Sequence, residues 1–368
     1  MEESIRILET SKASVKSARD KLTLASDNKL QIFVNVKKGG NIAENAAKSV
    51  EANQLQTPFK DIDFTADQRL DSLLEEINVL GKIEQRLATK TANIGTADIY
   101  KNESLLQVKG SRKYNVKVRS DKNGCSIVSA CTLENGTIIL SDYNNRKLKR
   151  LDSSTYTLID YCDLQGRPWQ VCPLNKQQAA VCLADKKEVH FISVSSKMAL
   201  TNKMKTDFEC YGLSYANGNL YVSDIYTSVY IYSVSGRKLK QFSKDQSGQK
   251  LFSVIRSLAV SKDGSKIYVA DRNNGLIILD NNGRVVGRFN DSQLRGAYDC
   301  CLTGTGSLLV CGMYSNNVLQ FGLNSNLIGE VLKFDDTSAG HQAICCNQQM
   351  SKIIIGRDRN EIEVYDLI

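Results

Sequence analysis

A repeated pattern of strands and turns in residues 111–368 restricts the fold more than any other feature of this sequence. An apolar run of β-forming residues ends in a small residue and an aspartate, a polar turn follows, and a second β-forming run comes after the turn. The aspartate, or the residue that replaces it, stands at Asp142, Asp185, Asp224, Asp271, Gly312 and Arg357. The steps between these positions are 39 to 47 residues long with a mean of 43, so six units need 258 residues, which is the length of this region.

A period near 43 residues, built from short strands and tight turns, predicts a β-propeller with six blades. Each blade would hold four antiparallel strands, and closure of the ring would leave few strand edges exposed. Turn-forming pairs precede the second strand of three units, at Asn135-Gly136, Asn217-Gly218 and Asp263-Gly264. The chain ends after the third strand of the last unit, Glu361 to Asp366, so we expect Tyr114 to Arg119 to supply the outer strand of the sixth blade.

Residues 1–87 follow a helical pattern instead. Apolar or small residues from Leu8 to Val36 recur at alternating spacings of three and four, and a second apolar stripe runs from Leu70 to Leu80. The predicted fold class is therefore an all-β six-bladed propeller over residues 113–368, preceded by an α-helical coiled-coil region and a linker over 88–112. We expect the helical region to self-associate, and packing of its helices within one chain is the alternative.

Three segments of the N-terminal region, Asn28–Lys38, Phe64–Leu70 and Leu80–Ile83, read NKLQIFVNVKK, FTADQRL and LGKI. They resemble the C-terminal part of the coiled coil in tripartite-motif (TRIM) proteins of invertebrates, especially molluscs. In that family the coiled coil leads into a six-bladed propeller related to the NHL repeat, whose consensus this chain meets best at Asp142–Leu148. The resemblance covers essentially the whole chain. It implies the part of a RING-type ubiquitin ligase that recognises a substrate or partner and self-associates.

The zinc-binding head of such ligases has no counterpart in the N-terminal residues. RING and B-box domains need Cys and His ligands, and residues 1–124 contain neither. We therefore expect either that the chain begins inside the coiled coil of a longer ligase or that it is an adaptor without a ligase head. Whether the chain belongs to an enzyme stays open at this point.

Basic and aromatic residues recur in the loops that a propeller would place on one face. The net charge of +8 comes entirely from residues beyond 110, because residues 1–110 hold 16 basic against 16 acidic side chains. Basic groups neutralise phosphates, and aromatic faces stack unpaired bases or grip apolar side chains. We predict that this face binds a protein target, with single-stranded RNA as the alternative ligand and a solvated loop face as the structural alternative. The candidate residues are Arg146, Lys147, Lys186, Lys187, Arg272, Arg357, Arg359, Arg167, Arg256, Arg295, Tyr143, Trp169, Tyr211, Tyr226, Tyr298 and Tyr314.

No catalytic residue, metal site or cofactor is predicted. The recurring aspartates are interpreted as groups that accept backbone N–H bonds in turns, and the two histidines, His190 and His341, are too few for a catalytic or zinc centre. The 11 cysteines lack the Cys-x-x-Cys spacing of zinc fingers, so we expect them to be reduced and buried. Neighbours on a strand point to opposite faces, so neither Cys300-Cys301 nor Cys345-Cys346 is expected to share a metal.

The sequence also contains no apolar run near the roughly 20 residues that a membrane helix needs. Its first residues, Met1 to Ser4, are acidic and have no apolar stretch behind them. We therefore expect a cytoplasmic protein without a membrane partner.

Overall fold

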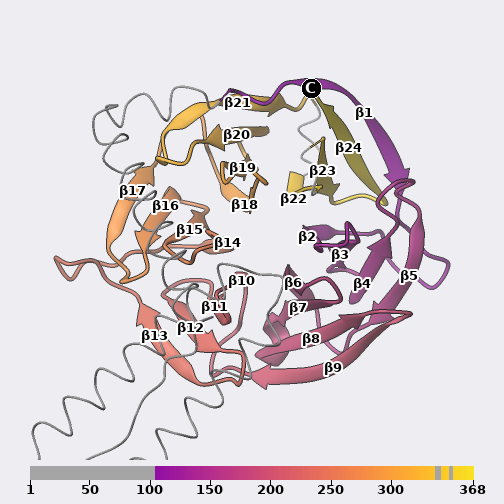
Figure 1. The fold of residues 1–368 in the computed structure, drawn as a ribbon, viewed down its shortest axis with the longest axis horizontal. Helices are drawn as coiled ribbons and strands as arrows, with labels where there is room; N and C mark the ends of the chain where they lie inside the picture. The colour runs from indigo at the N-terminus through magenta and orange to yellow at the C-terminus, as the bar shows by residue number, and fades with distance from the viewer. Residues whose placement is uncertain (1–103, 336–340, 348–350) are drawn as a thin grey trace, which may run out of the picture. The chain divides into compact units, whose positions relative to one another are not determined.

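Six four-stranded antiparallel sheets are arranged in a ring in the computed structural model (Figure 1), which describes residues 104–335, 341–347 and 351–368. The sheets are the blades of a propeller, and we number them 1 to 6 from the blade formed by β2 to β5. In every blade the first strand lies next to the ring axis and the last one lies on the rim (Figure 1). The expected all-β six-bladed propeller is therefore confirmed.

Blades 1 to 3 contain β2 (Ile127–Thr132), β3 (Ile138–Asp142), β4 (Lys147–Leu151), β5 (Leu158–Asp163), β6 (Pro168–Asn175), β7 (Gln178–Leu183), β8 (Glu188–Val194), β9 (Met198–Lys205), β10 (Leu213–Ala216), β11 (Asn219–Ser223), β12 (Val229–Ser233) and β13 (Lys238–Phe242). Blades 4 to 6 contain β14 (Ile255–Val260), β15 (Lys266–Asp271), β16 (Gly275–Asp280), β17 (Val285–Phe289), β18 (Ala297–Leu302), β19 (Leu308–Gly312), β20 (Asn317–Phe321), β21 (Leu327–Lys333), β22 (His341–Cys346), β23 (Lys352–Arg357), β24 (Glu361–Leu367) and β1 (Val108–Asn115).

Blade 6 combines strands from both ends of the propeller, as the sequence predicted. Its outer strand is β1, which pairs antiparallel with β24 and places Arg112 opposite Val364. The bounds differ from the expected Tyr114 to Arg119, because the strand begins at Val108 and ends at Asn115. Most of β1 is exposed and polar, so it lacks the alternation of apolar residues that marks a half-buried strand. Charged residues on such an edge also discourage pairing with another chain.

The apolar core lies between neighbouring blades. The middle strands of a blade are buried on both faces because a further blade packs on each side, and in β15 every residue from Ile267 to Asp271 is buried. Between blades 6 and 1, Ile127, Leu140, Ile354 and Ile362 belong to one cluster of buried side chains. The ring is thus closed by apolar packing as well as by the pairing of β1 with β24.

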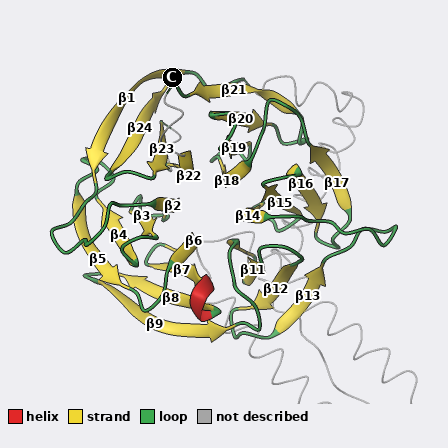
Figure 2. Ribbon diagram, turned by 180° about the vertical axis from the view of Figure 1, so that it is seen from behind, coloured by secondary structure: helices red, strands yellow, loops and turns green. Residues whose placement is uncertain are grey.

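The α-helical part of the predicted fold class is not supported. The described ranges contain no α-helix, and their single helical segment is a 3-10 turn, η1 (Ala184–Lys186), drawn in red in Figure 2. Residues 1–87, on which the coiled coil was expected, lie outside the described residues, as does most of the expected linker. The expectation rested on a narrow stripe with small residues at many seam positions, a pattern that supplies little apolar surface. No helix long and apolar enough to cross a bilayer occurs in the described part of the chain.

Candidate recognition site

Two sets of loops form one face of the ring, which we call the loop face: the loops after the second strand of each blade and the loops that lead into each innermost strand. Aspartates hold the two sets together. Asp142 accepts the backbone N–H of Ser126 at 3.1 Å, and Asp185 accepts that of Arg167 at 2.9 Å. Asp271 likewise accepts the backbone N–H groups of Ser253 and Val254 in the loop that leads into blade 4. Asp142 also accepts the N–H of Asn145 at 3.4 Å in the turn that follows it, and Asp271 accepts that of Asn273 at 3.1 Å. The turn-stabilising role expected for the recurring aspartates is confirmed at these two positions, whereas the bond of Asp185 reaches the loop that leads into β6.

Four aromatic side chains from four blades meet on this face, and we call them the aromatic cluster. Trp169, at the start of β6, is its centre. The ring centroids of Tyr143, Tyr211 and Tyr298 lie 5.4, 5.0 and 6.4 Å from that of Trp169. Trp169 and Tyr298 are buried, whereas Tyr143 and Tyr211 are half-buried. Such aromatic contacts stabilise by about 0.5–1.5 kcal/mol per pair beyond the area that they bury.

Two arginines stack on the aromatic cluster. The Arg256 guanidinium carbon lies 5.6 Å from the Trp169 centroid and 5.3 Å from that of Tyr298. The Arg167 guanidinium carbon lies 5.1 Å from the Tyr143 centroid, and its Nη1 donates to the Tyr143 hydroxyl at 3.2 Å. Within the described residues, Arg256 Nε is buried without a hydrogen-bond partner. The cluster therefore holds two positive charges by stacking rather than by ion pairing.

Two tyrosines of the cluster, Tyr211 and Tyr298, are neutral at physiological pH. Burial raises the pKa of Tyr298 to about 12. Burial, followed by the nearby Glu209 carboxylate, also raises the pKa of Tyr211 to about 12. The Tyr211 hydroxyl donates to Glu209 at 3.3 Å, and Glu209 itself is exposed at the rim of the cluster. The arginines thus set the sign of the charge at the centre of the site.

A smaller group of the same kind forms beside blades 4 and 5. The Arg272 guanidinium carbon lies 5.0 Å from the Tyr314 ring centroid, and Arg295 Nη2 donates to the Tyr314 carbonyl at 3.2 Å. Tyr314 remains 43% exposed, and Tyr226 of blade 3 is 56% exposed. These tyrosines offer open aromatic faces at the edge of the loop face.

The remaining candidate residues do not join these groups. Lys147 is buried in β4, where its Nζ lies 2.7 Å from an Asp163 carboxylate oxygen. Arg357 is buried in β23 and paired with Glu363. Both cations are therefore neutralised within their own blades. The other basic candidates are exposed in loops: Arg146, Lys186, Lys187 and Arg359.

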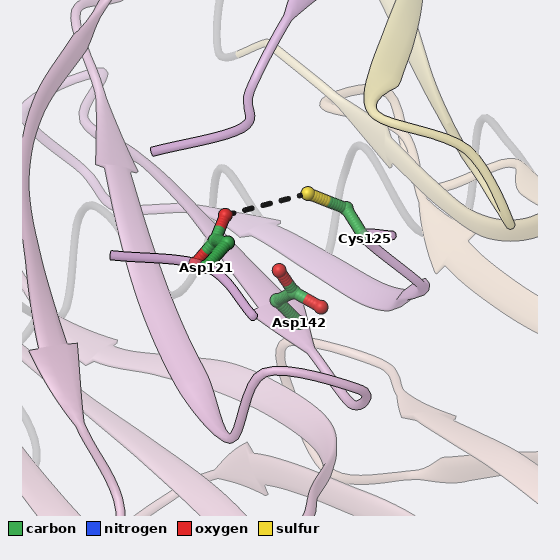
Figure 3. Close-up of side chains that lie close together, drawn as sticks. All are labelled: Asp121, Cys125 and Asp142. Carbon is green, nitrogen blue, oxygen red and sulfur yellow. Dashed lines mark hydrogen bonds between the residues drawn. The ribbon is translucent and has the colours of Figure 1, made fainter. Parts of the chain in front are cut away.

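A buried polar cluster that the sequence did not reveal lies in blade 1. Asp121, Cys125 and Asp142 come together there (Figure 3), with ligand atoms close enough to hold a metal ion. The ammonium of Lys149 already stands among them, 2.7 Å from Asp121 Oδ2, 2.6 Å from Asp142 Oδ2 and 3.1 Å from Cys125 Sγ. The lysine occupies the position that a cation would need. A lysine in the middle of a fully buried strand, here β4, was the available sequence signal.

Lys149 and Asp142 stabilise the charged forms of each other. Burial alone would lower the pKa of Lys149, but hydrogen bonds to Asp121 and Asp142 outweigh it and raise that pKa. Burial alone would raise the pKa of Asp142, but the Lys149 and Asn145 hydrogen bonds outweigh it and lower that pKa. Burial and the Asp142 charge raise the pKa of the Cys125 thiol to about 12, so it remains protonated. The arrangement is that of a structural ion pair.

One of the two histidines is packed inside blade 2. His190 is buried in β8, and its Nε2 lies 2.8 Å from Glu188 Oε2, whose carboxylate also binds Lys203. The side chain of His341 lies outside the described residues.

Comparisons with known proteins support the propeller fold and assign no function to this chain. No protein-family model matches the chain, and no curated protein matches it. A solved streptogramin B lyase structure is similar with a TM-score of 0.54 and 8% sequence identity, covering 70% of this chain and 98% of that one. A hydrazine synthase of Kuenenia stuttgartiensis aligns with a TM-score of 0.48 and 12% identity, covering 66% of this chain and 76% of that one. The expected TRIM membership has no support among these comparisons.

Proposed function

We propose that this chain is a recognition module that binds an acidic segment of a protein partner on the loop face. Propellers generally act as scaffolds for protein interactions, and the six-bladed fold is shared with solved structures. The observation that carries the proposal is the pair Arg167 and Arg256, stacked on aromatic rings from different blades. Trp, Tyr and Arg are also the residue types that dominate binding energy at protein interfaces.

An acidic ligand fits this site better than a neutral one. The Arg256 side chain is half-buried and forms no ion pair with the described residues, so a ligand carboxylate would supply the missing negative charge. Charge-assisted hydrogen bonds contribute about 1.5–3 kcal/mol each. The exposed rings of Tyr226 and Tyr314 would pack against apolar parts of the same ligand.

The TRIM resemblance adds a role for the partner. In that family the propeller presents a substrate to a ligase head, so the partner of this chain would be a protein marked for ubiquitination. Only the resemblance of the three N-terminal segments supports this role. No residue of the loop face contributes to it.

A competition between two defined ligands tests the proposal. An oligo-glutamate peptide and a single-stranded oligo-uridine RNA are titrated into the full chain and into the variants Arg256→Gln and Arg112→Gln. Arg112 is an exposed arginine on the rim strand β1, so it is the matched control. We expect the peptide to bind and Arg256→Gln to weaken it about tenfold, with no change for Arg112→Gln.

Two results would count against this function. Equal peptide affinity in both variants would place the binding elsewhere than at the loop face. Binding of the RNA alone, with an affinity that falls steeply as salt rises, would favour the RNA alternative, because neutralised phosphates release counterions.

A further inference from the structure

The innermost strands of blades 5 and 6 bring two cysteines from different blades into contact. Cys301 lies near the end of β18 and Cys346 is the last residue of β22. Their Sγ atoms are 3.7 Å apart. The two residues are separated by 45 positions in the sequence, so the contact exists only because the ring places these strands side by side.

The alternation of side chains along each strand explains why these two sulfurs meet. Cys300 points the other way, toward blade 4, where its Sγ lies 3.7 Å from Ser257 Oγ. Cys345 points toward blade 1, where its Sγ lies 3.9 Å from Thr132 Oγ1. The expectation that neither adjacent pair would share a ligand thus agrees with the directions of the side chains. No sequence signal predicted the contact between the two pairs.

The contact is open to small molecules. Cys301 and Cys346 are half-buried, and among the other described cysteines only Cys162 is as accessible. Both line a channel of about 220 Å³ that runs along the innermost strands. Cys346 also borders a cavity of about 690 Å³ on the face opposite the loop face. Hydrogen peroxide is small enough to enter this channel, which passes beside the two cysteines.

We propose that Cys301 and Cys346 form a disulfide between blades 5 and 6 when the protein meets hydrogen peroxide. One thiol, as its thiolate, attacks a peroxide oxygen, and the O–O bond breaks to give a sulfenic acid and one water. The second thiol attacks that sulfur, the S–O bond breaks, and a second water leaves as the S–S bond forms. In total, two thiols lose two hydrogen atoms and one peroxide is reduced to two waters.

The reaction requires a modest movement and proceeds slowly. A disulfide has an S–S length of about 2.05 Å, so the sulfurs must approach by somewhat less than 2 Å. The contact with Cys346 and burial raise the pKa of Cys301, so little thiolate is present at neutral pH and the rate rises with pH. The product closes a loop of more than forty residues and ties blade 6, which carries the ring closure, to blade 5.

Peptide mapping of the full chain tests the proposal. The protein is treated with hydrogen peroxide, its remaining thiols are blocked, and it is digested without a reductant. We expect a linked pair of peptides that carry Cys301 and Cys346, absent before oxidation and lost on reduction with dithiothreitol. Cys301→Ser and Cys346→Ser should each reduce the linked pair to background, whereas Cys162→Ser should leave it unchanged.

The unfolding temperature and the oxidation products of the two cysteines complete the test. The oxidised wild-type protein should unfold at a higher temperature than the reduced protein, and the two cysteine variants should show no such shift. A linked pair that persists in Cys301→Ser would assign the bond to other sulfurs and overturn the proposal. Oxidation of both cysteines to sulfinic or sulfonic acids without any linked peptide in the wild-type protein would overturn it as well, and this outcome does not depend on whether a variant folds.

Discussion

Arg256 and Trp169 contact each other twice. The Arg256 guanidinium carbon lies 5.6 Å from the Trp169 ring centroid, and the Trp169 indole N–H donates to the Arg256 backbone carbonyl at 3.2 Å. The two residues belong to blades 4 and 2, so this contact bypasses blade 3 rather than joining neighbouring blades. It fixes the orientation of the arginine on the loop face before any ligand binds, which lowers the cost of ordering the site.

Trp169 should report binding through its fluorescence. It is the only tryptophan in the sequence, and its ring lies against the arginine that we expect to bind a carboxylate. Titration with the oligo-glutamate peptide should therefore change the emission of the wild-type protein and leave that of Arg256→Gln nearly unchanged. A change of equal size in both proteins would show that the tryptophan senses an event elsewhere.

Lys149→Met should destabilise the propeller strongly. The substitution leaves Asp121 and Asp142 buried without their cation, and breaking a buried ion pair in this way costs about 3–5 kcal/mol. Urea unfolding measures the loss, and Lys113→Met on the exposed strand β1 is the control, for which we expect little change. A loss below about 1 kcal/mol for Lys149→Met would mean that the aspartates find other partners.

The same cluster contributes to the acid sensitivity of the fold. The pKa of Asp142 is lower in the folded chain than in the unfolded chain, so its contribution to stability is present above the unfolded value of about 4. This contribution is lost as the pH falls through the lowered pKa of Asp142 in the folded chain. The acid-induced loss of stability should therefore be smaller in Asp142→Asn than in the wild-type protein, although the variant is less stable at neutral pH.

Asp299 should give the opposite pH dependence. Burial raises its pKa to about 7, in spite of hydrogen bonds from Ser257 Oγ at 2.6 Å and from the Ile344 backbone N–H at 2.9 Å. The folded state therefore holds a proton that the unfolded state releases near pH 4. Stability should fall as the pH rises from about 4 to 7, by an amount on the order of 4 kcal/mol when the carboxyl is fully ionised.

Urea unfolding at a series of pH values checks this slope. Asp299→Asn should flatten the pH dependence between about 4 and 7, and Asp335→Asn, at an exposed position, should leave it unchanged. A wild-type protein whose stability does not fall across this range would show that Asp299 is ionised in the fold and stabilised by its three hydrogen-bond donors.

The repeat could be predicted because it depends on local signals. A strand that ends in aspartate, followed by a turn, marks the first four blades. Asp142 and Asp271 accept backbone N–H groups in the turns that follow them, as their position implied. The grouping of Trp169 with tyrosines of other blades also follows once each loop is assigned to one face. Predicting these features requires only the order of the strands along the chain, and the register in which the strands pair is not needed.

Features that depend on cross-strand register could not be predicted. Lys147 and Arg357 were expected in loops, but they lie in β4 and β23. Each is neutralised there by a carboxylate on the adjacent strand, which the spacing in sequence does not show. The contact between Cys301 and Cys346 requires two blades to be packed side by side. The outer strand β1 was misplaced by several residues because an exposed strand needs few apolar residues to form.

Asp185 should act as a positioning residue for ligand binding. Its Oδ1 accepts the backbone N–H of Arg167 at 2.9 Å and so holds the loop that carries this arginine. Asp185→Ala removes the acceptor and frees the loop, so we expect the oligo-glutamate peptide to bind several-fold more weakly while the melting temperature changes little. Asp185→Asn keeps a carbonyl oxygen at the same position and should restore most of the affinity.

A matched control separates this role from a general loss of stability. Asp263 stabilises a turn in the same manner, by accepting the Ser265 backbone N–H at 3.1 Å, but it lies on the opposite face of the ring. Asp263→Ala should therefore leave peptide affinity unchanged. If Asp263→Ala and Asp185→Ala weaken binding equally, the effect comes from the loss of any turn-stabilising aspartate, and Asp185 does not position Arg167. If Asp185→Asn fails to restore affinity, the negative charge of the carboxylate matters more than its hydrogen bond to the loop.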